Sequence, residues 1–239
     1  MILLKIVADL HTHTIASGHA YSTIDEVVRT ASQRGLKVIG ITDHGPLMPG
    51  AAHPYYFGNL KTLPDELYGV RILCGIEANI LTEGKLDVEK QELEKLDFVA
   101  AGIHHDGGYE GESKEDHTIA TIRAIENPLV KMITHPANLS LPVDIEKVVK
   151  AAAREDVILE INASSFDGHH YGRRGSEELS LELCQLAQEF NVPLSINSDA
   201  HFHTEVGRVD TLYPLVEKAG LKEEDIINCS LEKTLSYLN

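Results

Sequence analysis

The chain contains 13 histidines and no tryptophan, and several of these histidines have the spacing of metal ligands. Histidine is the commonest metal ligand in proteins and titrates near neutral pH. His11 and His13 form a His-x-His pair, and in an extended chain residues i and i+2 point to the same side. Their two imidazoles can therefore bind one ion. Such a pair also occurs by chance, so its meaning depends on its surroundings.

Further side chains of the same kind follow one strand-like segment after another. Seven imidazoles and two carboxylates share this placement: His11, His13, His19, His44, Glu77, His104, His135, Asp199 and His201. A zinc ion holds about four ligands. With one carboxylate bridging, nine ligands fit three ions and would more than saturate two. A single histidine such as His44 could instead lie in the core and bond to a backbone carbonyl, but this explanation fits the nine together poorly.

The elements that must position these side chains alternate regularly along the chain. Short apolar segments rich in β-branched residues predict strands at 5–9, 37–42, 70–75, 98–102, 132–134, 158–162 and 194–197. They are continuously apolar, as in parallel strands covered on both faces. Apolar residues with helical spacing predict helices over 24–31, 145–152 and 179–190. Thr23 with Glu26, Asp144 and Ser176 provide capping signals at the starts of these three helices.

This β-α order, repeated about seven times, predicts either a closed parallel barrel or an open doubly wound sheet. No GxGxxG sequence follows the first strand, which weakens a dinucleotide-binding fold. In a parallel barrel all strand carboxyl ends open onto one face, where such enzymes build their sites. The nine side chains would converge there. The length of 239 residues suits one domain spanning 1–239.

Composition limits the classes of partner and compartment. The formal charge of −16 would repel a long polyanion, so we expect no long nucleic acid partner, although a small anion can bind a locally positive site. Three cysteines without a CxxC pair make a disulfide framework unlikely to form and favour a reducing cytoplasm. The apolar runs are shorter than the about 20 residues that cross a bilayer, and the amino-terminal segment does not have the pattern of a signal peptide.

Six short motifs give the chain a resemblance to a known family. They are DLHTHT at 9–14, ITDHG at 41–45, GIEANI at 75–80, GIH at 102–104, THP at 134–136 and SDAH at 198–201. With these motifs in this order, the chain resembles the PHP (polymerase and histidinol phosphatase) domain family. The stretches HAYST at 19–23, NASSF at 162–166 and RRGSE at 173–177 are similar to the small stand-alone bacterial phosphatase branch.

The resemblance implies a distorted (β/α)7 TIM-like barrel and a trinuclear metal centre, usually of zinc. It implies three groups of ligands that share Glu77. The first group is His11, His13, Glu77 and Asp199, the second is Glu77, His104 and His135, and the third is His19, His44 and His201. Imidazole-rich sites also take manganese or iron according to supply, so the metal stays open.

The resemblance further implies a phosphatase that hydrolyses phosphoric monoesters. Three divalent ions less the charges of Glu77 and Asp199 leave about +4, which would attract a phosphate dianion. A metal-bridging water would be deprotonated near neutral pH, and the hydroxide would attack phosphorus in line. We expect Asp199 to orient this nucleophile. Arg173 or Arg174 would bind the phosphate or a second anionic group, unless both are simply exposed loop residues.

Three neighbouring polar residues and three other functions stay open. Asp9, Asp43 and Asn162 either orient ligands or have structural roles. An amidohydrolase usually bridges its metals with lysine, whereas Glu77 takes that place here. A phosphodiesterase or exonuclease acting on short nucleotides is compatible with the charge, and so is a metal-stabilised module that binds another protein. We expect a small phosphorylated substrate and no membrane, and the natural substrate and a homo-oligomeric state stay open.

Overall fold

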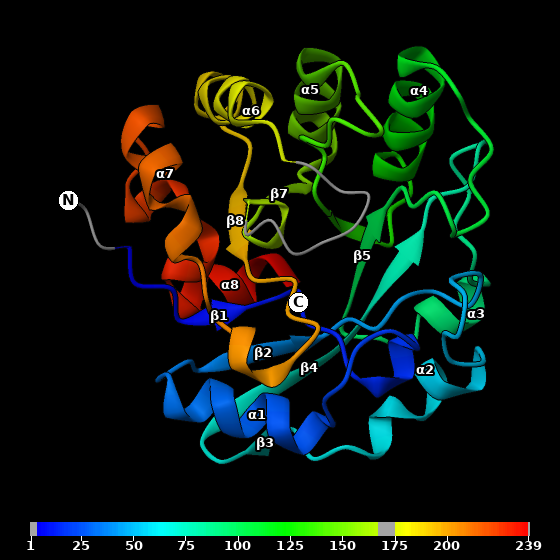
Figure 1. Cartoon of the computed structure of the whole chain (residues 1–239), viewed down its shortest axis with the longest axis vertical. Helices are drawn as coiled ribbons and strands as arrows, with labels where there is room; N and C mark the ends of the chain where they lie inside the picture. The colour runs from blue at the N-terminus through cyan, green and yellow to red at the C-terminus, as the bar shows by residue number, and fades with distance from the viewer. Residues whose placement is uncertain (1–3, 167–174, 239) are drawn as a thin grey trace.

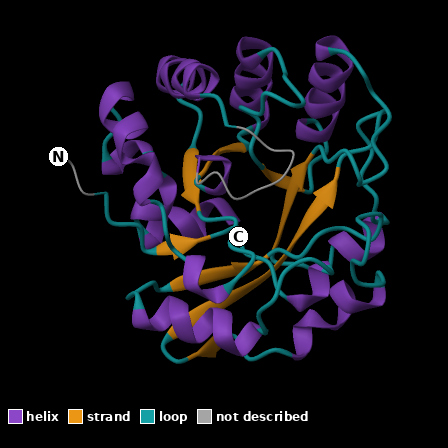
Figure 2. Ribbon diagram, in the orientation of Figure 1, coloured by secondary structure: helices purple, strands orange, loops and turns teal. Residues whose placement is uncertain are grey.

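The structure is a computed structural model that describes residues 4–166 and 175–238. Seven parallel strands form a nearly closed barrel, and helices surround it on the outside (Figures 1 and 2). The parallel strands, in their order around the barrel, are β1 (Ala8–Asp9), β2 (Val38–Ile41), β4 (Val70–Asn79), β5 (Phe98–Gly102), β6 (Val130–Ile133), β7 (Ile158–Asn162) and β8 (Leu194–Asn197). The predicted (β/α)7 TIM-like barrel is confirmed, and the open doubly wound sheet is wrong. The short strand β3 (Glu66–Leu67) adds an antiparallel pair beside β4.

The helices that follow the strands begin where local signals predict. They are α1 (Ile24–Gln33), α2 (Tyr55–Asn59), α3 (Lys90–Leu93), α4 (Lys114–Ile125), α5 (Ile145–Glu155), α6 (Glu177–Phe190), α7 (Tyr213–Ala219) and α8 (Leu231–Leu238). The capping box of Thr23 and Glu26 starts α1, Asp144 caps α5 and Ser176 caps α6. Within the described part of the chain, all helices are too short or too polar to span a membrane.

Strand β4 is longer than the sequence predicts, and this places Glu77 inside it. The first half of β4 pairs with β2, and the second half, Gly75 to Asn79, pairs with β5. The predicted end at residue 75 is therefore wrong. Glu77 and Asn79 are polar, but both are fully buried because this part of β4 lines the barrel.

Backbone and side-chain bonds join β1 to β8 and close the barrel. At the carboxyl end, Thr12 and Ala200 form a parallel bridge, and the His13 amide donates to the Ala200 carbonyl at 2.9 Å. At the opposite end the Asn228 side chain lies between the two strands. Its amide nitrogen donates to the carbonyls of Ala8 and Ile196, and its oxygen accepts from the Ile196 amide. Asn228 thus supplies bonds that a neighbouring strand would otherwise supply.

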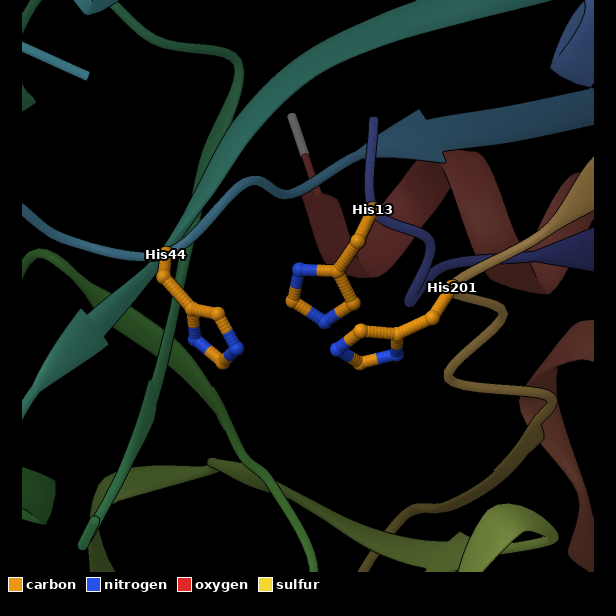
Figure 3. Close-up of side chains that lie close together, drawn as sticks. All are labelled: His13, His44 and His201. Atoms are coloured by element: carbon orange, nitrogen blue, oxygen red, sulfur yellow. The ribbon is translucent and has the colours of Figure 1, made fainter. Parts of the chain in front are cut away.

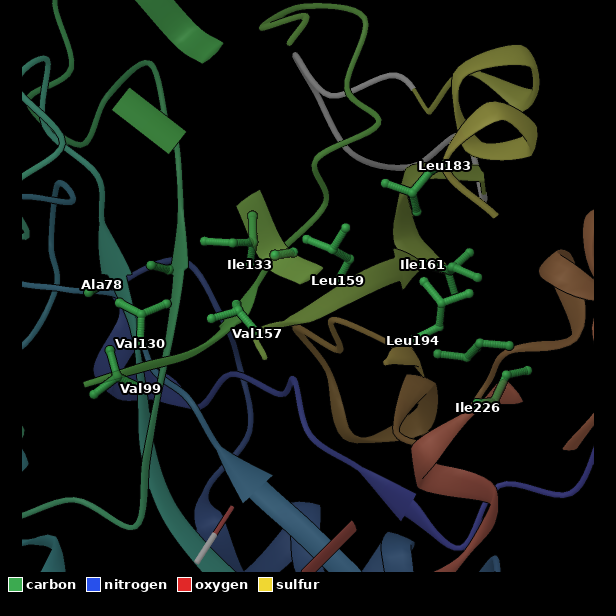
Figure 4. Packing of buried hydrophobic residues seen from close by; sticks show 14 of the residues in the cluster. Ala78, Val99, Val130, Ile133, Val157, Leu159, Ile161, Leu183, Leu194 and Ile226 are labelled. Carbon is green, nitrogen blue, oxygen red and sulfur yellow. The ribbon is translucent and has the colours of Figure 1, made fainter. Parts of the chain in front are cut away.

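The apolar core has two parts. The larger part packs the helices onto the outside of the strands, and Figure 4 shows Leu159 and Ile161 of β7 in it beside Leu183 of α6. The smaller part fills the barrel, with Phe98 against strands whose residues Gly40 and Gly75 leave room for its ring. Leu238 of α8 belongs to this inner cluster, so the end of the barrel opposite the histidines is apolar.

Candidate metal centre

The nine predicted ligand residues lie together at the carboxyl end of the barrel. His11 and His13 follow β1, His44 follows β2, Glu77 lies in β4, His104 follows β5, His135 follows β6, and Asp199 and His201 follow β8. Seven of the nine are buried, the His104 side chain is 10% exposed, and His19 is exposed at the rim. Residues that are up to 190 positions apart in the sequence thus meet because the strands are parallel and closed into a ring.

Four of these residues surround one point. The Nε2 atoms of His11 and His13 lie 3.0 Å apart, and they lie 3.3 and 3.5 Å from Glu77 Oε2. Asp199 Oδ1 lies 3.5 Å from His11 Nε2 and 3.0 Å from His13 Nε2. Ligand atoms around a tetrahedral zinc ion are about 3.3 Å apart, given metal–nitrogen distances of about 2.0 Å. These four donor atoms therefore have the spacing that such an ion requires.

The other oxygen of Glu77 faces a second group. Glu77 Oε1 lies 2.8 Å from His135 Nε2 and 3.3 Å from His104 Nε2. The Thr134 hydroxyl donates to the same oxygen at 2.7 Å. Because its two oxygens face different groups of imidazoles, Glu77 has the geometry of a bridging carboxylate.

A third group of imidazoles lies nearer the rim. The rings of His13, His44 and His201 point into a common space in Figure 3, and their donor atoms lie within 4.8 Å of one another. The exposed His19 stacks on this group, with its ring 4.9 Å from both His44 and His201. The structure therefore brings together His19, His44 and His201, as the third predicted group requires.

Several buried donor atoms in the cluster have no ordinary partner. His44 Nδ1, Glu77 Oε2 and His104 Nε2 are buried and make no well-directed hydrogen bond, although each has a close ionic neighbour. Leaving a buried polar atom without such a bond costs about 1–3 kcal/mol. A metal ion would satisfy these atoms. The buried clusters of histidine and glutamate thus fit metal ions, and the donors are the imidazoles and carboxylates that zinc accepts.

Comparison with known proteins identifies the family. The PHP domain model matches residues 9–164. The chain belongs to the PHP family. A probable phosphatase of Caldanaerobacter subterraneus subsp. tengcongensis is 47% identical over 98% of this chain and 92% of its own length. A probable phosphatase of Acetivibrio thermocellus is 46% identical over 98% of this chain and 96% of its own length.

The PHP fold is also found by structural comparison. The crystal structure of histidinol phosphate phosphatase from Lactococcus lactis, complexed with zinc, L-histidinol and phosphate, aligns with a TM-score of 0.62. The alignment covers 90% of this chain and 94% of that protein, at 18% sequence identity. This likeness concerns the arrangement of the barrel.

Within this PHP barrel, polar neighbours orient the imidazoles. His13 Nδ1 lies 3.0 Å from Ser17 Oγ, whose hydroxyl donates to Asp43 at 2.7 Å. Because that proton is committed to Asp43, Ser17 accepts from His13 Nδ1, and His13 Nε2 is left for the cluster. Asn79 Oδ1 lies 2.8 Å from His104 Nδ1 in the same sense. Sequence reasoning did not single out Ser17 or Asn79, although Asn79 lies in the GIEANI motif.

The three polar residues left open by the sequence differ in their contacts. Asn162 donates to Asp199 Oδ2 at 3.1 Å, so it contacts a cluster carboxylate directly. Asp43 contacts the cluster through Ser17. Asp9 accepts from the Ser198 hydroxyl and from the Gly207 amide, and it holds the loops after β1 and β8 together. Asp9 thus has a structural role, whereas Asn162 and Asp43 contact groups that orient the cluster.

Glu160 of β7 is a further buried carboxylate beside the cluster that sequence reasoning missed. It lies 2.8 Å from His11 Nδ1 and is 1% exposed. A signal was present, because a charged residue stands in the middle of the apolar segment ILEIN. Arg173 and Arg174, which the sequence suggested for substrate binding, lie outside the described residues, and their roles stay predictions.

Burial and mutual charge set the pKa values in the cluster. Burial lowers the pKa of His44 to about 4 and, together with His44 and His201, holds that of His13 well below its usual range. Burial acts in the same direction on His11, but the carboxylates of Glu160, Glu77 and Asp199 outweigh it and raise the pKa of His11 well above its ordinary value. Burial alone would raise the pKa of Glu77, and the surrounding histidines reverse this and lower it. Glu77 is therefore charged at neutral pH.

Two of the cluster residues have a strained backbone. His135 has φ 36° and Asp199 has φ 55°, in the left-handed region that side chains other than glycine rarely adopt. Such strain costs of order 1–3 kcal/mol and persists where the surrounding structure enforces it. Both residues aim their side chains at the cluster, so the strain coincides with the site.

Proposed function

We propose that this PHP protein is a metal-dependent phosphatase that hydrolyses small phosphoric monoesters. The observation that carries the proposal is the buried ring of seven imidazoles and two carboxylates around Glu77, whose two oxygens face two groups of ligands. The relatives that are called probable phosphatases support the reaction class. Zinc is our first choice of metal, because imidazole and carboxylate suit it and the Lactococcus lactis structure was complexed with zinc.

We assign the ligands to three divalent ions that share Glu77. His11, His13, Glu77 and Asp199 would hold the first ion, and Glu77, His104 and His135 the second. His19, His44 and His201 would hold the third ion near the rim, where His19 is exposed and a substrate can approach. When bound, such ions lower the pKa of water to about 7 and stabilise negative charge on phosphoryl oxygens.

Asp199 is our candidate for orienting the attacking water. Its Oδ2 atom accepts hydrogen bonds from Ser164 at 2.8 Å and from Asn162 at 3.1 Å. These two donors fix the carboxylate plane and keep Oδ1 on the side of His11 and His13. A group held in this way needs little reorganisation during the reaction, which is how positioned polar groups contribute to catalysis.

The charge distribution favours a small anionic substrate over a long one. The chain as a whole carries −16, whereas three divalent ions with two carboxylates would leave about +4 at the mouth of the barrel. A phosphate monoester can reach this local positive charge without spreading over the acidic exterior. A long nucleic acid would meet the exterior and be repelled.

The test compares the chain with its Glu77→Gln variant. We expect about three ions per chain by elemental analysis and hydrolysis of a simple aryl phosphate monoester. The Glu77→Gln variant should lose at least one ion and about 100-fold or more in turnover, because it loses a bridging ligand. Glu189→Gln on the exposed face of α6 is the matched control and should change neither quantity.

The same assay separates the alternatives. A metal-loaded chain that cleaves phosphodiesters and spares monoesters would support a phosphodiesterase or exonuclease. Cleavage of amides and cyclic amides would support an amidohydrolase. A chain that binds no metal, or one that binds metal and hydrolyses none of these substrates, would contradict the proposed function.

A further inference from the structure

We infer that Glu160 is a positioning residue that fixes two proposed ligands, His11 and His135, without itself being a ligand. The inference rests on the proposed metal centre. It concerns a residue outside the nine, and it states which hydrogen bonds of that residue set the direction of each imidazole.

The position of Glu160 in β7 sends its side chain into the barrel. Leu159 and Ile161 of the same strand belong to the outer core, whereas Ile158 belongs to the inner cluster. Because side chains alternate along a strand, Glu160 points inward with Ile158. It is 1% exposed, and a buried carboxylate is stable only when hydrogen bonds or charges compensate for the lost water.

Four hydrogen-bond donors from different parts of the chain surround the Glu160 carboxylate. Oε1 accepts from His11 Nδ1 at 2.8 Å and from Asn197 Nδ2 at 3.0 Å. Oε2 accepts from the backbone amide of His135 at 2.8 Å and from Asn162 Nδ2 at 3.1 Å. A carboxylate has about four acceptor positions, so these bonds occupy them all. Glu160 could bind a metal only by giving up one of these bonds.

The bond to His11 determines which ring nitrogen faces the metal centre. The ionised carboxylate of Glu160 can only accept, so His11 Nδ1 must carry a hydrogen. A metal-bound imidazole keeps one hydrogen, and with Nδ1 protonated the metal must bind Nε2. This atom is the one that lies 3.0 Å from His13 Nε2 and 3.3 Å from Glu77 Oε2.

The bond to the His135 amide fixes the second ligand through the backbone. His135 has φ 36°, a conformation that needs support from its surroundings. With the amide held by Glu160 Oε2, the His135 ring places Nε2 2.8 Å from Glu77 Oε1. The two oxygens of Glu160 therefore align one imidazole on each side of the Glu77 carboxylate.

The Glu160→Gln variant tests the inference, because glutamine has nearly the same shape but only one oxygen. The backbone amide of His135 is an invariant donor, so the glutamine oxygen should turn to it. The glutamine NH2 group then faces His11 Nδ1 and forces that nitrogen to accept. The hydrogen of His11 moves to Nε2, where it points at the metal position. We expect zinc affinity to fall about 10–100-fold, the range typical of lost partners behind a metal ligand.

The decisive readout is the tautomer of His11, measured by 15N–1H long-range NMR spectra of the zinc-loaded protein. The native chain should show hydrogen on His11 Nδ1, and the Glu160→Gln variant should lose that signal together with zinc. Glu189→Gln should match the native chain. A native His11 without hydrogen on Nδ1, or a folded Glu160→Gln variant with unchanged zinc affinity and tautomer, would overturn the inference.

The experiment separates this inference from the proposed function. The tautomer and the zinc affinity need no substrate, so they test Glu160 even if no phosphatase activity is found. If the native chain binds no zinc, the proposed function fails, and the spectrum of the metal-free native chain still reports whether His11 Nδ1 donates to Glu160. If Glu160→Gln fails to fold, the native spectrum alone decides.

Discussion

The buried imidazoles offer one ring nitrogen to the centre because the other nitrogen already has a partner. Glu160 takes Nδ1 of His11, Ser17 takes Nδ1 of His13 and Asn79 takes Nδ1 of His104. Each partner comes from a strand or loop other than the one that carries the histidine, except Ser17, which lies four residues beyond His13. Such partners fix ring orientation and ligand basicity in metal sites. The ring of ligands is thus defined as much by its neighbours as by its own spacing.

The raised pKa of His11 predicts proton release when metal binds. With its pKa well above the ordinary value, His11 carries a proton at pH 7 in the metal-free chain, and ligation requires that this proton leave. Zinc affinity should therefore rise with pH until the raised pKa of His11 is passed, by up to about tenfold per pH unit for one proton. His44, whose pKa is about 4, should release no proton above about pH 5.

Calorimetric titration of the metal-free chain with zinc at pH 7, in two buffers of different ionisation enthalpy, measures this release. A heat that is independent of the buffer would contradict the raised pKa of His11. The same pKa affects stability without metal. Because the folded pKa is raised, His11 stabilises the metal-free fold below its unfolded pKa of about 6.5, and this contribution is lost as the pH rises through the folded pKa.

The ligands themselves could be predicted from sequence, and their partners could not. A histidine directly after an apolar strand is recognisable because parallel strands bring their ends to one face. Glu160 bonds to His11 across 149 positions of sequence, and no local spacing connects the two residues. Only the closed barrel reveals that they are neighbours, so the sequence predicts the identity of the ligands and leaves their orientation undetermined.

At the scale of elements, the ends of β4, β5 and β6 crowd around Glu77. Gly102 is the last residue of β5, and a methyl group added there would overlap the Thr134 hydroxyl and lie 2.9 Å from His135 Cε1 and 3.2 Å from Glu77 Oε1. Glycine therefore lets the strand pass close to the cluster. We predict that Gly102→Ala displaces His135 and lowers metal content, with a loss of about 1–3 kcal/mol of unfolding free energy from overpacking.

Denaturant unfolding and elemental analysis of the same preparation check this prediction. Gly58→Ala in α2 is the matched control, because the added methyl group would meet only the flexible ends of Glu92 and Lys95. That exchange should leave metal content unchanged and alter stability by no more than about 1 kcal/mol. A Gly102→Ala variant with native metal content and native stability would show that β5 can move away from the cluster without cost.

Element boundaries could be predicted where the signal is local. The starts of α1, α5 and α6 follow from side chains that bond to the first turn of each helix. The end of β4 depends on pairing with β5, which extends the strand past the point where pairing with β2 stops. Polar Glu77 and Asn79 suggest the end of a strand in a sequence. In the barrel they face the interior, where the site is.

At the scale of the molecule, the barrel has one apolar end and one polar end. Leu238 and Ile227 close the lower end with the inner core, and the Asn228 side chain joins β1 to β8 across 220 positions of sequence. The composition predicts a barrel of this size, but it carries no sign that a single asparagine completes the ring. Closure at that end leaves the polar end as the side on which the nine side chains meet.

The concentration of buried charge at the polar end predicts how the whole fold responds to metal removal. Glu77, Asp199 and Glu160 are three buried carboxylates, and without metal they are balanced mainly by His11. Ions that bind only the folded chain add about 2.7 kcal/mol per site at a free concentration 100 times the dissociation constant. Dialysis against a chelator should therefore lower the thermal unfolding midpoint, and added zinc should restore it. The Glu77→Gln variant should gain less from zinc than the native chain does, because it lacks the bridging ligand. An unchanged midpoint after verified removal of metal would mean that the cluster is stable by its own hydrogen bonds and would count against a metal centre at this end of the barrel.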